Sequence, residues 1–454
     1  MNSNAEIRRR AVTLRKRLWA WCRLICLAGV LSACGAAPTT LTLATPPNLY
    51  TLETGEPYPA HNVPKGLRRT LTEILYVTDR NPIIAADGAL SGYGTERSRS
   101  MAFGVSLVEY GDLQSWADLV AQTQAGDSRA LTKLDPVYME EFARFPETPL
   151  PIGQAGGRLQ ASHEAAEVYQ ARARVMQTEL GARLRNHGLN RVLVYIHGVN
   201  NSFDDGVGTL ANIWHYSGRR SLPVSYSWPA GNDGLLAYFR DAEAGDFSVF
   251  HVKEFLRTLA AVPEVDRIDI VAHSRGSAVM TDALRELIIE ARAKGQNPSV
   301  ALKTGILVLA AADLDVGVVQ QRLVAERFAD GFEQINIYAN PDDRALNLSR
   351  IIGNVGRLGS VGTSVGDGND FGQLVHDHKV NVIVVEDPGK GLGHAYFREN
   401  PAVMSDMVLA LRTRKLPGTA YRPLDPVSEN VWVLHPNYPA QVLPDMLDQP
   451  VVER

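Results

Sequence analysis

Short, continuous apolar runs recur along the chain, each ending at polar or glycine-rich residues. Such runs are typical of parallel strands, which helices bury on both faces. The clearest runs occupy residues 191–196, 270–272, 305–311, 334–340 and 380–386. Helices are predicted over residues 161–187 and 401–414, the second with Asn400 as its N-cap and Pro401 at its first position. This alternation predicts an α/β fold with a mostly parallel sheet and helices on both faces.

One apolar run stops at a serine that lies between small residues, in Ala272-His273-Ser274-Arg275-Gly276. This pattern indicates a nucleophile elbow, where a strained turn between strand and helix exposes the serine hydroxyl above the sheet. Ala272 replaces the usual first glycine and adds a single methyl group at the crowded position. By itself the pattern also fits an ordinary strand-to-helix turn with a capping serine.

A nucleophilic serine on such a fold needs backbone N–H groups that stabilise an oxyanion, one of them from the loop after an earlier strand. The run from residue 191 ends in His197-Gly198-Val199, and Ser202 with Asp205 forms a capping box that starts the next helix. We therefore assign the oxyanion donors as the backbone N–H groups of Val199 and Arg275. His197 is interpreted as a structural residue that orients this loop.

An acid and a base should follow the serine in that order, because the later strands deliver them beside the elbow. Asp343 lies just past the strand at 334–340, and His394 lies in a glycine-flanked loop after the strand at 380–386. Asp313, after the strand at 305–311, is the alternative acid. We favour Asp343, and we expect the other aspartate to be a helix cap or a loop brace.

Five short motifs together resemble a bacterial α/β-hydrolase family of unassigned substrate. They are His197-Gly198-Val199-Asn200, Ser227-Trp228-Pro229, Ala272-His273-Ser274-Arg275-Gly276, Asp343-Arg344-Ala345-Leu346 and Gly393-His394-Ala395-Tyr396. The early strands of that family are matched by residues 74–80 and 101–108, so the resemblance covers about residues 68 to 413. It implies an α/β-hydrolase fold and a catalytic triad of Ser274, Asp343 and His394. Arg275 departs from the apolar residue common in the family, which bears on the polarity of the substrate.

Composition and charge exclude some classes of function. A formal net charge of -4 over 454 residues gives no field that would hold nucleic acid, and no basic patch is present. The only candidate metal-ligand pair is His376-Asp377-His378, and without a second cluster we interpret it as a solvated loop. The sequence therefore predicts no metal, no cofactor and no nucleic-acid partner.

The first residues resemble a bacterial lipoprotein signal peptide. Arginines and lysine precede an apolar stretch at residues 18–31, which is short for a membrane span, and Leu31-Ser32-Ala33-Cys34 resembles a lipobox. The resemblance implies cleavage before Cys34, lipid on that residue and a membrane-anchored protein of the cell envelope. A retained anchor or an uncleaved leader remains the alternative. All three cysteines lie in this leader, so the folded domain is predicted to contain no disulfide.

The predicted organisation is a signal peptide at residues 1–33, a Thr- and Pro-rich extended tether at 34–66, an α/β-hydrolase domain at 67–414 and an extended tail at 415–454. Residues 111–160 carry no readable pattern. The glycine-rich residues 353–372 are predicted to be a loop near the site, either a flap or a plain solvent loop.

The favoured function is hydrolysis of an ester or related acyl bond in a small-molecule substrate, by a serine mechanism with an acyl-enzyme. Two alternatives remain at this point. The same triad would serve a peptidase or amidase, and the chain could instead be a scaffold or binding lipoprotein that keeps the fold without turnover.

Overall fold

A large mixed β-sheet forms the centre of the computed structural model, which describes residues 41–52, 57–125, 132–155, 158–232, 236–353, 355–363, 377–387 and 393–440. The strand order is β12-β13-β11-β10-β9-β8-β6-β7-β1-β2-β3. The strands are β1 (Leu71–Ile84), β2 (Leu90–Tyr110), β3 (Leu134–Arg144), β6 (Arg191–Ile196), β7 (Leu222–Ser227), β8 (Arg267–His273), β9 (Thr304–Ala310), β10 (Gln334–Ala339), β11 (Val380–Val385), β12 (Asp425–Ser428) and β13 (Val431–Leu434). Along the sheet, the eight strands β13, β11, β10, β9, β8, β6, β7 and β1 are parallel to their neighbours in this series. Strands β2 and β3 at one edge and β12 at the other are antiparallel additions.

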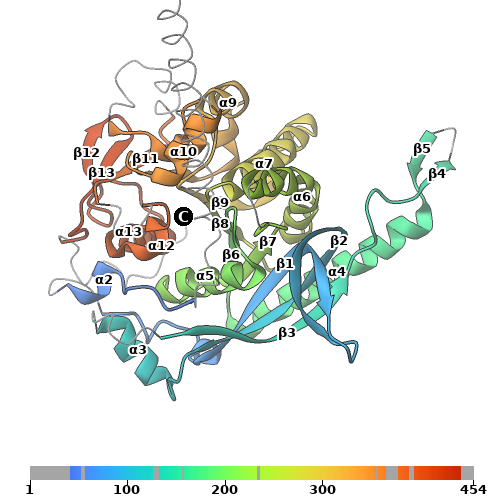
Figure 1. The fold of residues 1–454 in the computed structure, drawn as a ribbon, viewed down its shortest axis with the longest axis horizontal. Coiled ribbons are helices and arrows are strands. Elements are labelled where there is room, and N and C mark those ends of the chain that lie inside the picture. The colour runs from blue at the N-terminus through green and yellow to red at the C-terminus, as the bar shows by residue number, and fades with distance from the viewer. Residues whose placement is uncertain are drawn as a thin grey trace, which may run out of the picture.

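Helices cover both faces of this sheet (Figure 1). They are α2 (Asn48–Thr51), α3 (Trp116–Gln124), α4 (His163–His187), α5 (Phe203–Tyr216), α6 (Ala237–Ala260), α7 (Gly276–Ala293), α8 (Pro298–Leu302), α9 (Val316–Val318), α10 (Arg344–Gly353), α12 (Tyr396–Glu399) and α13 (Pro401–Thr413), with short turns η1 (Lys65–Leu67), η2 (Val319–Val324), η3 (Phe328–Gly331) and η4 (Leu358–Ser360). The predicted parallel sheet with helices on both faces is therefore present.

Two apolar cores separate on the two faces because successive residues of a strand point to opposite sides. Along β6, Val192, Val194 and Ile196 join the core beneath α4, α6 and α7. Leu193 and Tyr195 join the core beneath α5 and α13. Strand β6 is thus buried on both faces of the sheet, as its continuous apolar sequence indicated.

Two ends of the domain differ from the predicted boundaries. Residues 41–52 and 57–66, expected in an extended tether, pack on the domain, where Leu43, Leu49 and Tyr58 are buried in the core beside α5 and α13. Apolar side chains between the threonines and prolines bury there and fix the segment. Beyond residue 414, β13 pairs with β11, and Arg422 is fully buried, so the sheet extends into the predicted tail. The folded domain therefore exceeds residues 67–414 at both ends.

Residues 111–160, which had no readable pattern, contain α3, β3 and a separate hairpin of β4 (Ile152–Ala155) and β5 (Arg158–Ala161). Figure 1 shows this hairpin standing away from the sheet near the start of α4. None of the helices in the described part of the chain combines the length and apolarity needed to cross a bilayer. Cys34 and residues 1–40 lie outside the described residues, as do 354 and 364–372 of the predicted flap, and residues 441–454 of the tail.

Candidate active site

The elbow has the strained backbone that the sequence predicted. Ser274 has φ of 52°, a left-handed conformation that a non-glycine residue adopts only when its surroundings enforce it. The enforcement comes from close packing: a Cβ atom on Gly276 would lie 2.2 Å from the carbonyl oxygen of His197, and one on Gly198 would lie 2.7 Å from Cβ of Ser274. Strand β8 therefore ends in a turn that only small neighbours permit.

A hydrogen-bonded chain links Ser274, His394 and Asp343. His394 Nε2 lies 2.9 Å from Ser274 Oγ, and His394 Nδ1 lies 2.7 Å from Asp343 Oδ2. Because the fully buried carboxylate accepts a hydrogen bond from the Nδ1–H group, Nε2 is left to accept a hydrogen bond from the serine hydroxyl. The structure thus brings together the three residues singled out from the sequence.

Asp343 is fixed by its own helix. It precedes α10, and its second oxygen, Oδ1, accepts a hydrogen bond of 2.9 Å from the backbone N–H of Leu346. One carboxylate oxygen therefore caps the amino end of α10, and the other accepts a hydrogen bond from the His394 imidazole. This arrangement gives the aspartate of the Asp343-Arg344-Ala345-Leu346 segment two partners at once.

The loop that carries His394 is held from below. Asn340 Nδ2 donates to the carbonyl oxygen of Gly393 at 2.8 Å, and the hydroxyl of Tyr396 donates to the carbonyl oxygen of Tyr338 at 2.7 Å. The Tyr396 hydroxyl also accepts from the backbone N–H of Ala311. Burial raises the pKa of Tyr396 well above its usual value, so the hydroxyl remains a donor. Residues 388–392 of the same loop lie outside the described residues.

Asp313, the alternative acid, lies behind the elbow with other partners. Its carboxylate accepts from the hydroxyls of Tyr238 at 2.6 Å and Ser349 at 2.9 Å, and it forms an ion pair with Arg357 at 3.3 Å. Burial and the Asp313 charge raise the pKa of Tyr238 to about 12, so this hydroxyl also stays protonated. Among the residues that the structure describes, the acid in contact with His394 is Asp343.

His273, directly before Ser274, packs beside the imidazole of His394. Its ring stacks on Phe397 with centroids 4.3 Å apart and meets His394 at 5.0 Å. Burial lowers the pKa of His273 well below its usual value, with further lowering from His394 and Arg398, so the ring is neutral. A neutral ring can pack beside His394 without opposing its protonation.

The backbone N–H groups of Val199 and Arg275 have no hydrogen-bond acceptor among the described residues. Val199 follows Gly198, which packs against Ser274, and Arg275 directly follows Ser274. Two free amides beside a serine hydroxyl are what an oxyanion hole requires. The sequence had assigned these two donors.

A carboxylate that sequence reasoning missed holds the loop of residues 197–201. Asp241 of α6, 1% exposed, accepts the backbone N–H of Asn200 at 2.8 Å and that of Gly231 at 3.1 Å through Oδ2. Its Oδ1 accepts from the backbone and side chain of Asn232. Asn200 has φ of 56°, so this carboxylate stabilises a left-handed turn just after Val199. The sequence of α6 does not distinguish this residue, because the helix also contains Glu243, Asp246 and Glu254.

A buried arginine holds the same loop from the other side. Arg80 of β1 is fully buried and donates to the carbonyl oxygens of Asn201 and Ala230, each at 2.7 Å, and to Ser227 Oγ at 2.9 Å. Its Nη2 also lies 3.2 Å from His197 Nε2. Because a guanidinium only donates, His197 Nε2 must accept, and its proton is on Nδ1, which faces the Gly198 carbonyl oxygen at 2.9 Å.

These contacts fix the role of His197. Burial, with a further contribution from the Arg80 charge, lowers the pKa of His197 to about 3. Trp228 stacks on the ring at 5.3 Å and donates its indole N–H to the His197 carbonyl oxygen. His197 therefore orients the loop and is uncharged near neutral pH, with its single proton on Nδ1.

The remaining candidate from the sequence is the possible metal-ligand pair at residues 376–378. No cluster of three or more potential ligands occurs among the described residues. Asp377 and His378 lie in a turn before β11, whereas His376 is outside the described residues. The side chain of Arg275 is 20% exposed and faces Asp246 of α6 at 3.3 Å.

A mostly parallel sheet, a strained serine at the end of its central strand and an acid and a base on later strands define the α/β-hydrolase class. Residues 172–413 match the family described as alpha/beta hydrolase of unknown function (DUF900), and the chain belongs to this family. The predicted α/β-hydrolase fold is thereby confirmed. Among curated proteins none matches. The solved structures include a match to an esterase of Pyrobaculum calidifontis in a monoclinic form, with 13% identity over 43% of this chain and 57% of that chain and a TM-score of 0.19.

Proposed function

We propose that this α/β hydrolase is a serine hydrolase that cleaves an ester or related acyl bond. The observation that carries the proposal is the hydrogen-bonded chain from Ser274 Oγ through His394 to the buried carboxylate of Asp343. The left-handed backbone at Ser274 supports it, because such strain is kept where an exposed nucleophile needs it. A scaffold protein without turnover would have no use for this combination.

The first half of the reaction forms an acyl-enzyme. His394 Nε2 takes the proton of Ser274 as Oγ attacks the substrate carbonyl carbon, and Asp343 stabilises the imidazolium. The N–H groups of Val199 and Arg275 donate to the developing oxyanion. When the intermediate collapses, His394 gives its proton to the leaving alcohol oxygen and the C–O bond breaks.

The second half returns the enzyme to its first state. Water loses a proton to His394 Nε2 and attacks the acyl carbon, and the same two amides stabilise the second oxyanion. His394 then protonates Ser274 Oγ, and the carboxylic acid leaves. Each proton passes through Nε2 alone, since Asp343 keeps Nδ1 protonated throughout.

Labelling with a fluorophosphonate probe, followed by hydrolysis of p-nitrophenyl esters of graded acyl length, tests this proposal. Wild-type protein should be labelled at Ser274, and Ser274→Ala should lose labelling and turnover by about a millionfold, as in a well-studied serine protease. Ser277→Ala is the matched control, since this buried hydroxyl only bonds the carbonyl oxygen of Ala272. Absence of labelling in folded wild-type protein would favour a non-catalytic scaffold. If peptide or amide substrates are turned over faster than every ester, the bond that the enzyme cleaves is an amide and not an ester.

We further propose that the protein is anchored to a membrane of the cell envelope by lipid on Cys34. The support is the order of basic residues, apolar residues and Leu31-Ser32-Ala33-Cys34 in the sequence. Wild-type protein should partition with membranes, and Cys34→Ser should be released or remain unprocessed. An intact mass that corresponds to the unacylated chain from Met1 in its native host would contradict this.

A further inference from the structure

Asn340 lies where the segment with Asp343 and the loop with His394 leave the sheet. It directly follows β10, and the neighbouring strand β11 runs parallel to β10 and leads into the His394 loop. Parallel neighbours lie about 4.8 Å apart, so their carboxyl ends deliver these two segments side by side. Asn340 is 1% exposed, so its polar groups need partners within the protein.

Each hydrogen-bonding group of Asn340 has such a partner. On the acid side, Oδ1 accepts the backbone N–H of Asp342 at 2.9 Å, and the backbone carbonyl oxygen accepts that of Asp343 at 3.1 Å. On the base side, Nδ2 donates to the carbonyl oxygen of Gly393 at 2.8 Å. The backbone N–H donates to the carbonyl oxygen of Gly359 at 2.9 Å. Asn340 therefore bonds both the segment that carries Asp343 and the loop that carries His394.

One orientation of the Asn340 amide satisfies both sides. The Gly393 carbonyl oxygen only accepts and the Asp342 N–H group only donates, so a rotated amide would oppose like groups on both sides. A serine hydroxyl could still accept from a backbone N–H two residues on, as in other turns, but it lacks the second polar atom. An asparagine thus joins two segments where a serine would hold one.

The bond to Gly393 restrains the backbone from which the His394 side chain projects. Gly393 has φ of 65°, a left-handed conformation, and it directly precedes His394. Its carbonyl group belongs to the planar peptide unit that includes the backbone nitrogen of His394, so a bond to that oxygen fixes the plane. The direction of the imidazole therefore depends on this plane.

We propose that Asn340 is a positioning residue that sets the spacing between the acid and the base, an inference that rests on the proposed hydrolase function. Its bonds to Gly393 and Asp343, together with the bond from His394 to Asp343, close a cycle. The bond between His394 and Asp343 changes in strength whenever the imidazole gains or loses a proton during turnover. The bonds of the neutral amide do not change, so they keep the two segments in register.

Asn340→Ser tests the proposal, because serine keeps the acceptor for Asp342 and loses the donor for Gly393. The assay is hydrolysis of the p-nitrophenyl ester that wild-type protein cleaves fastest. The expected result is a fall in kcat of about a hundredfold with little change in KM, the effect of misplacing a reacting group by about 1 Å. An unchanged kcat, or a loss confined to KM, would overturn the proposal.

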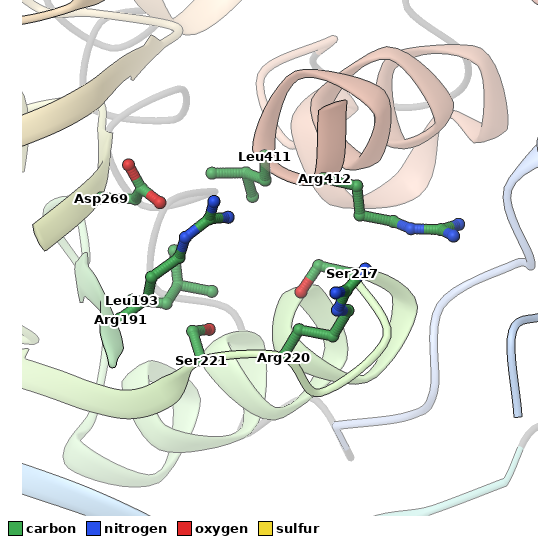
Figure 2. A pocket seen from close by; sticks show the side chains of 8 residues that line it. All are labelled: Arg191, Leu193, Ser217, Arg220, Ser221, Asp269, Leu411 and Arg412. Atoms are coloured by element: carbon green, nitrogen blue, oxygen red, sulfur yellow. The ribbon is translucent and has the colours of Figure 1, made fainter. Parts of the chain in front are cut away.

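Two control variants separate positioning from a general loss of stability. Asn336→Ser removes a fully buried asparagine of the same strand, which bonds Gln334 and Arg422, so it should lower the melting temperature and leave kcat unchanged. Ser221→Ala changes a side chain that lines a small pocket at the amino ends of the central strands, at the sheet edge opposite Ser274 (Figure 2). A loss of kcat in Asn336→Ser as large as in Asn340→Ser would refute a specific role.

A double-mutant cycle with Asp343→Asn shows whether Asn340 acts through the acid and the base. Once the acid is lost, its spacing from the base no longer limits the rate. In that background Asn340→Ser should lower the rate by no more than about twofold, the scatter of independent effects. A further loss of about a hundredfold would mean that the two residues act independently, and the proposal would be wrong.

A proton resonance gives a measurement that needs no turnover. The Nδ1 proton of His394 lies in a bond of 2.7 Å to a carboxylate and should give a separate downfield signal in protein labelled with ¹⁵N at histidine. Asn340→Ser should shift or broaden this signal, and Asn336→Ser should not. If wild-type protein cleaves no acyl substrate, the proposed function fails, and an unchanged signal in Asn340→Ser would separately refute the positioning role. If Asn340→Ser does not fold, Asn340→Thr carries the same measurements, since its methyl group fills part of the space of the amide.

Discussion

Exchanging each of two aspartates for asparagine distinguishes the acid that serves His394 from the one that braces the elbow. Both carboxylates are buried and lie within a few residues of strand ends. Asp343 contacts His394 Nδ1 at 2.7 Å, whereas Asp313 contacts Tyr238, Ser349 and Arg357. Both substitutions replace a carboxylate oxygen by an amide nitrogen, but one should lower turnover and the other should lower the melting temperature.

In Asp343→Asn the amide has to satisfy two donors with one oxygen. If that oxygen keeps the backbone N–H of Leu346, the amide N–H₂ faces His394 Nδ1 and forces the proton onto Nε2. An imidazole protonated at Nε2 cannot accept the Ser274 proton. Turnover should fall by about ten-thousandfold, the loss measured when the corresponding acid of a serine protease was exchanged for its amide. The melting temperature should change little, because the helix cap remains.

In Asp313→Asn the main loss is the negative charge beside Arg357. The two side chains are 3% and 11% exposed, so the arginine becomes a largely buried, unpaired cation. Removing one partner of a buried ion pair costs about 3 to 5 kcal/mol of folding free energy. His394 and its acid are untouched, so turnover per folded molecule should stay within about tenfold of wild type.

Single-turnover ester hydrolysis and thermal unfolding, measured on the same preparations, give the answer. The expected result is a large loss of rate with a nearly unchanged melting temperature for Asp343→Asn, and the reverse for Asp313→Asn. If the amide at 313 abolishes turnover and the one at 343 does not, the acid is on the earlier strand, and the assignment of Asp343 is wrong.

Three further predictions follow from the loop of residues 197–201 and the buried histidines. Asp241→Asn should lower kcat by about a hundredfold or more with little change in KM, because the loop that carries one proposed oxyanion donor loses the carboxylate that binds its backbone. An equal loss in kcat and in ground-state substrate binding contradicts this. Gly276→Ala should lower the melting temperature and turnover together, since its Cβ would lie 2.2 Å from the His197 carbonyl oxygen; a fully active variant refutes the close approach. Burial lowers the folded-state pKa of His197 to about 3 and those of His215 and His273 well below the usual value. Unfolded histidines take up protons near pH 6.5, so the free energy of unfolding is highest above this pH. It should fall as pH decreases towards the folded-state pKa, by up to about 1.4 kcal/mol per pH unit for each histidine. A urea-unfolding series that shows no change in this free energy below about pH 6 contradicts the prediction.

Local patterns in the sequence predicted the elements that lie close to the chemistry. The capping box of Ser202 and Asp205 and the Asn400 cap are both present, because a cap depends on residues only three positions apart. The strands with continuous apolar runs occur where expected, because burial on both faces leaves no polar alternation. The positions of Ser274, Asp343 and His394 at strand ends followed from the order of those strands.

The sequence did not reveal features that depend on contacts between distant segments. Strand β3 has a mixed pattern of buried and exposed residues and is held by its pairing with β2, so no periodic signal marks it. Arg80 is 121 residues from Asn201, and Asp241 is 41 residues from Asn200, so neither partner can be inferred from spacing. A buried charge is also atypical for its residue type, which makes a surface position the natural expectation.

Buried charges on both sides of residues 197–201 suggest why several motif residues outside the triad belong together. Burying ionised groups carries a desolvation cost, and this cost is offset only where their hydrogen-bonding groups find partners. Arg80 finds them on the backbone oxygens of Asn201 and Ala230, and Asp241 finds them on the amides of Asn200 and Gly231. A rigid backbone keeps an amide directed at a developing charge without reorganisation during the reaction. Hydrogen bonds to charged groups are stronger than those between neutral groups, so they hold this backbone more rigidly than the same number of neutral hydrogen bonds would.

The same reasoning gives roles to the serine and tryptophan of the Ser-Trp-Pro motif. Ser227 bonds both Arg80 and His197, and Trp228 covers the His197 ring and binds its carbonyl oxygen. Neither side chain has a part in the proposed chemistry, yet each fixes the residue that precedes Gly198. Two of the five motifs thus hold the loop of residues 197–201, and the other three contain Ser274, Asp343 and His394, the residues proposed to react.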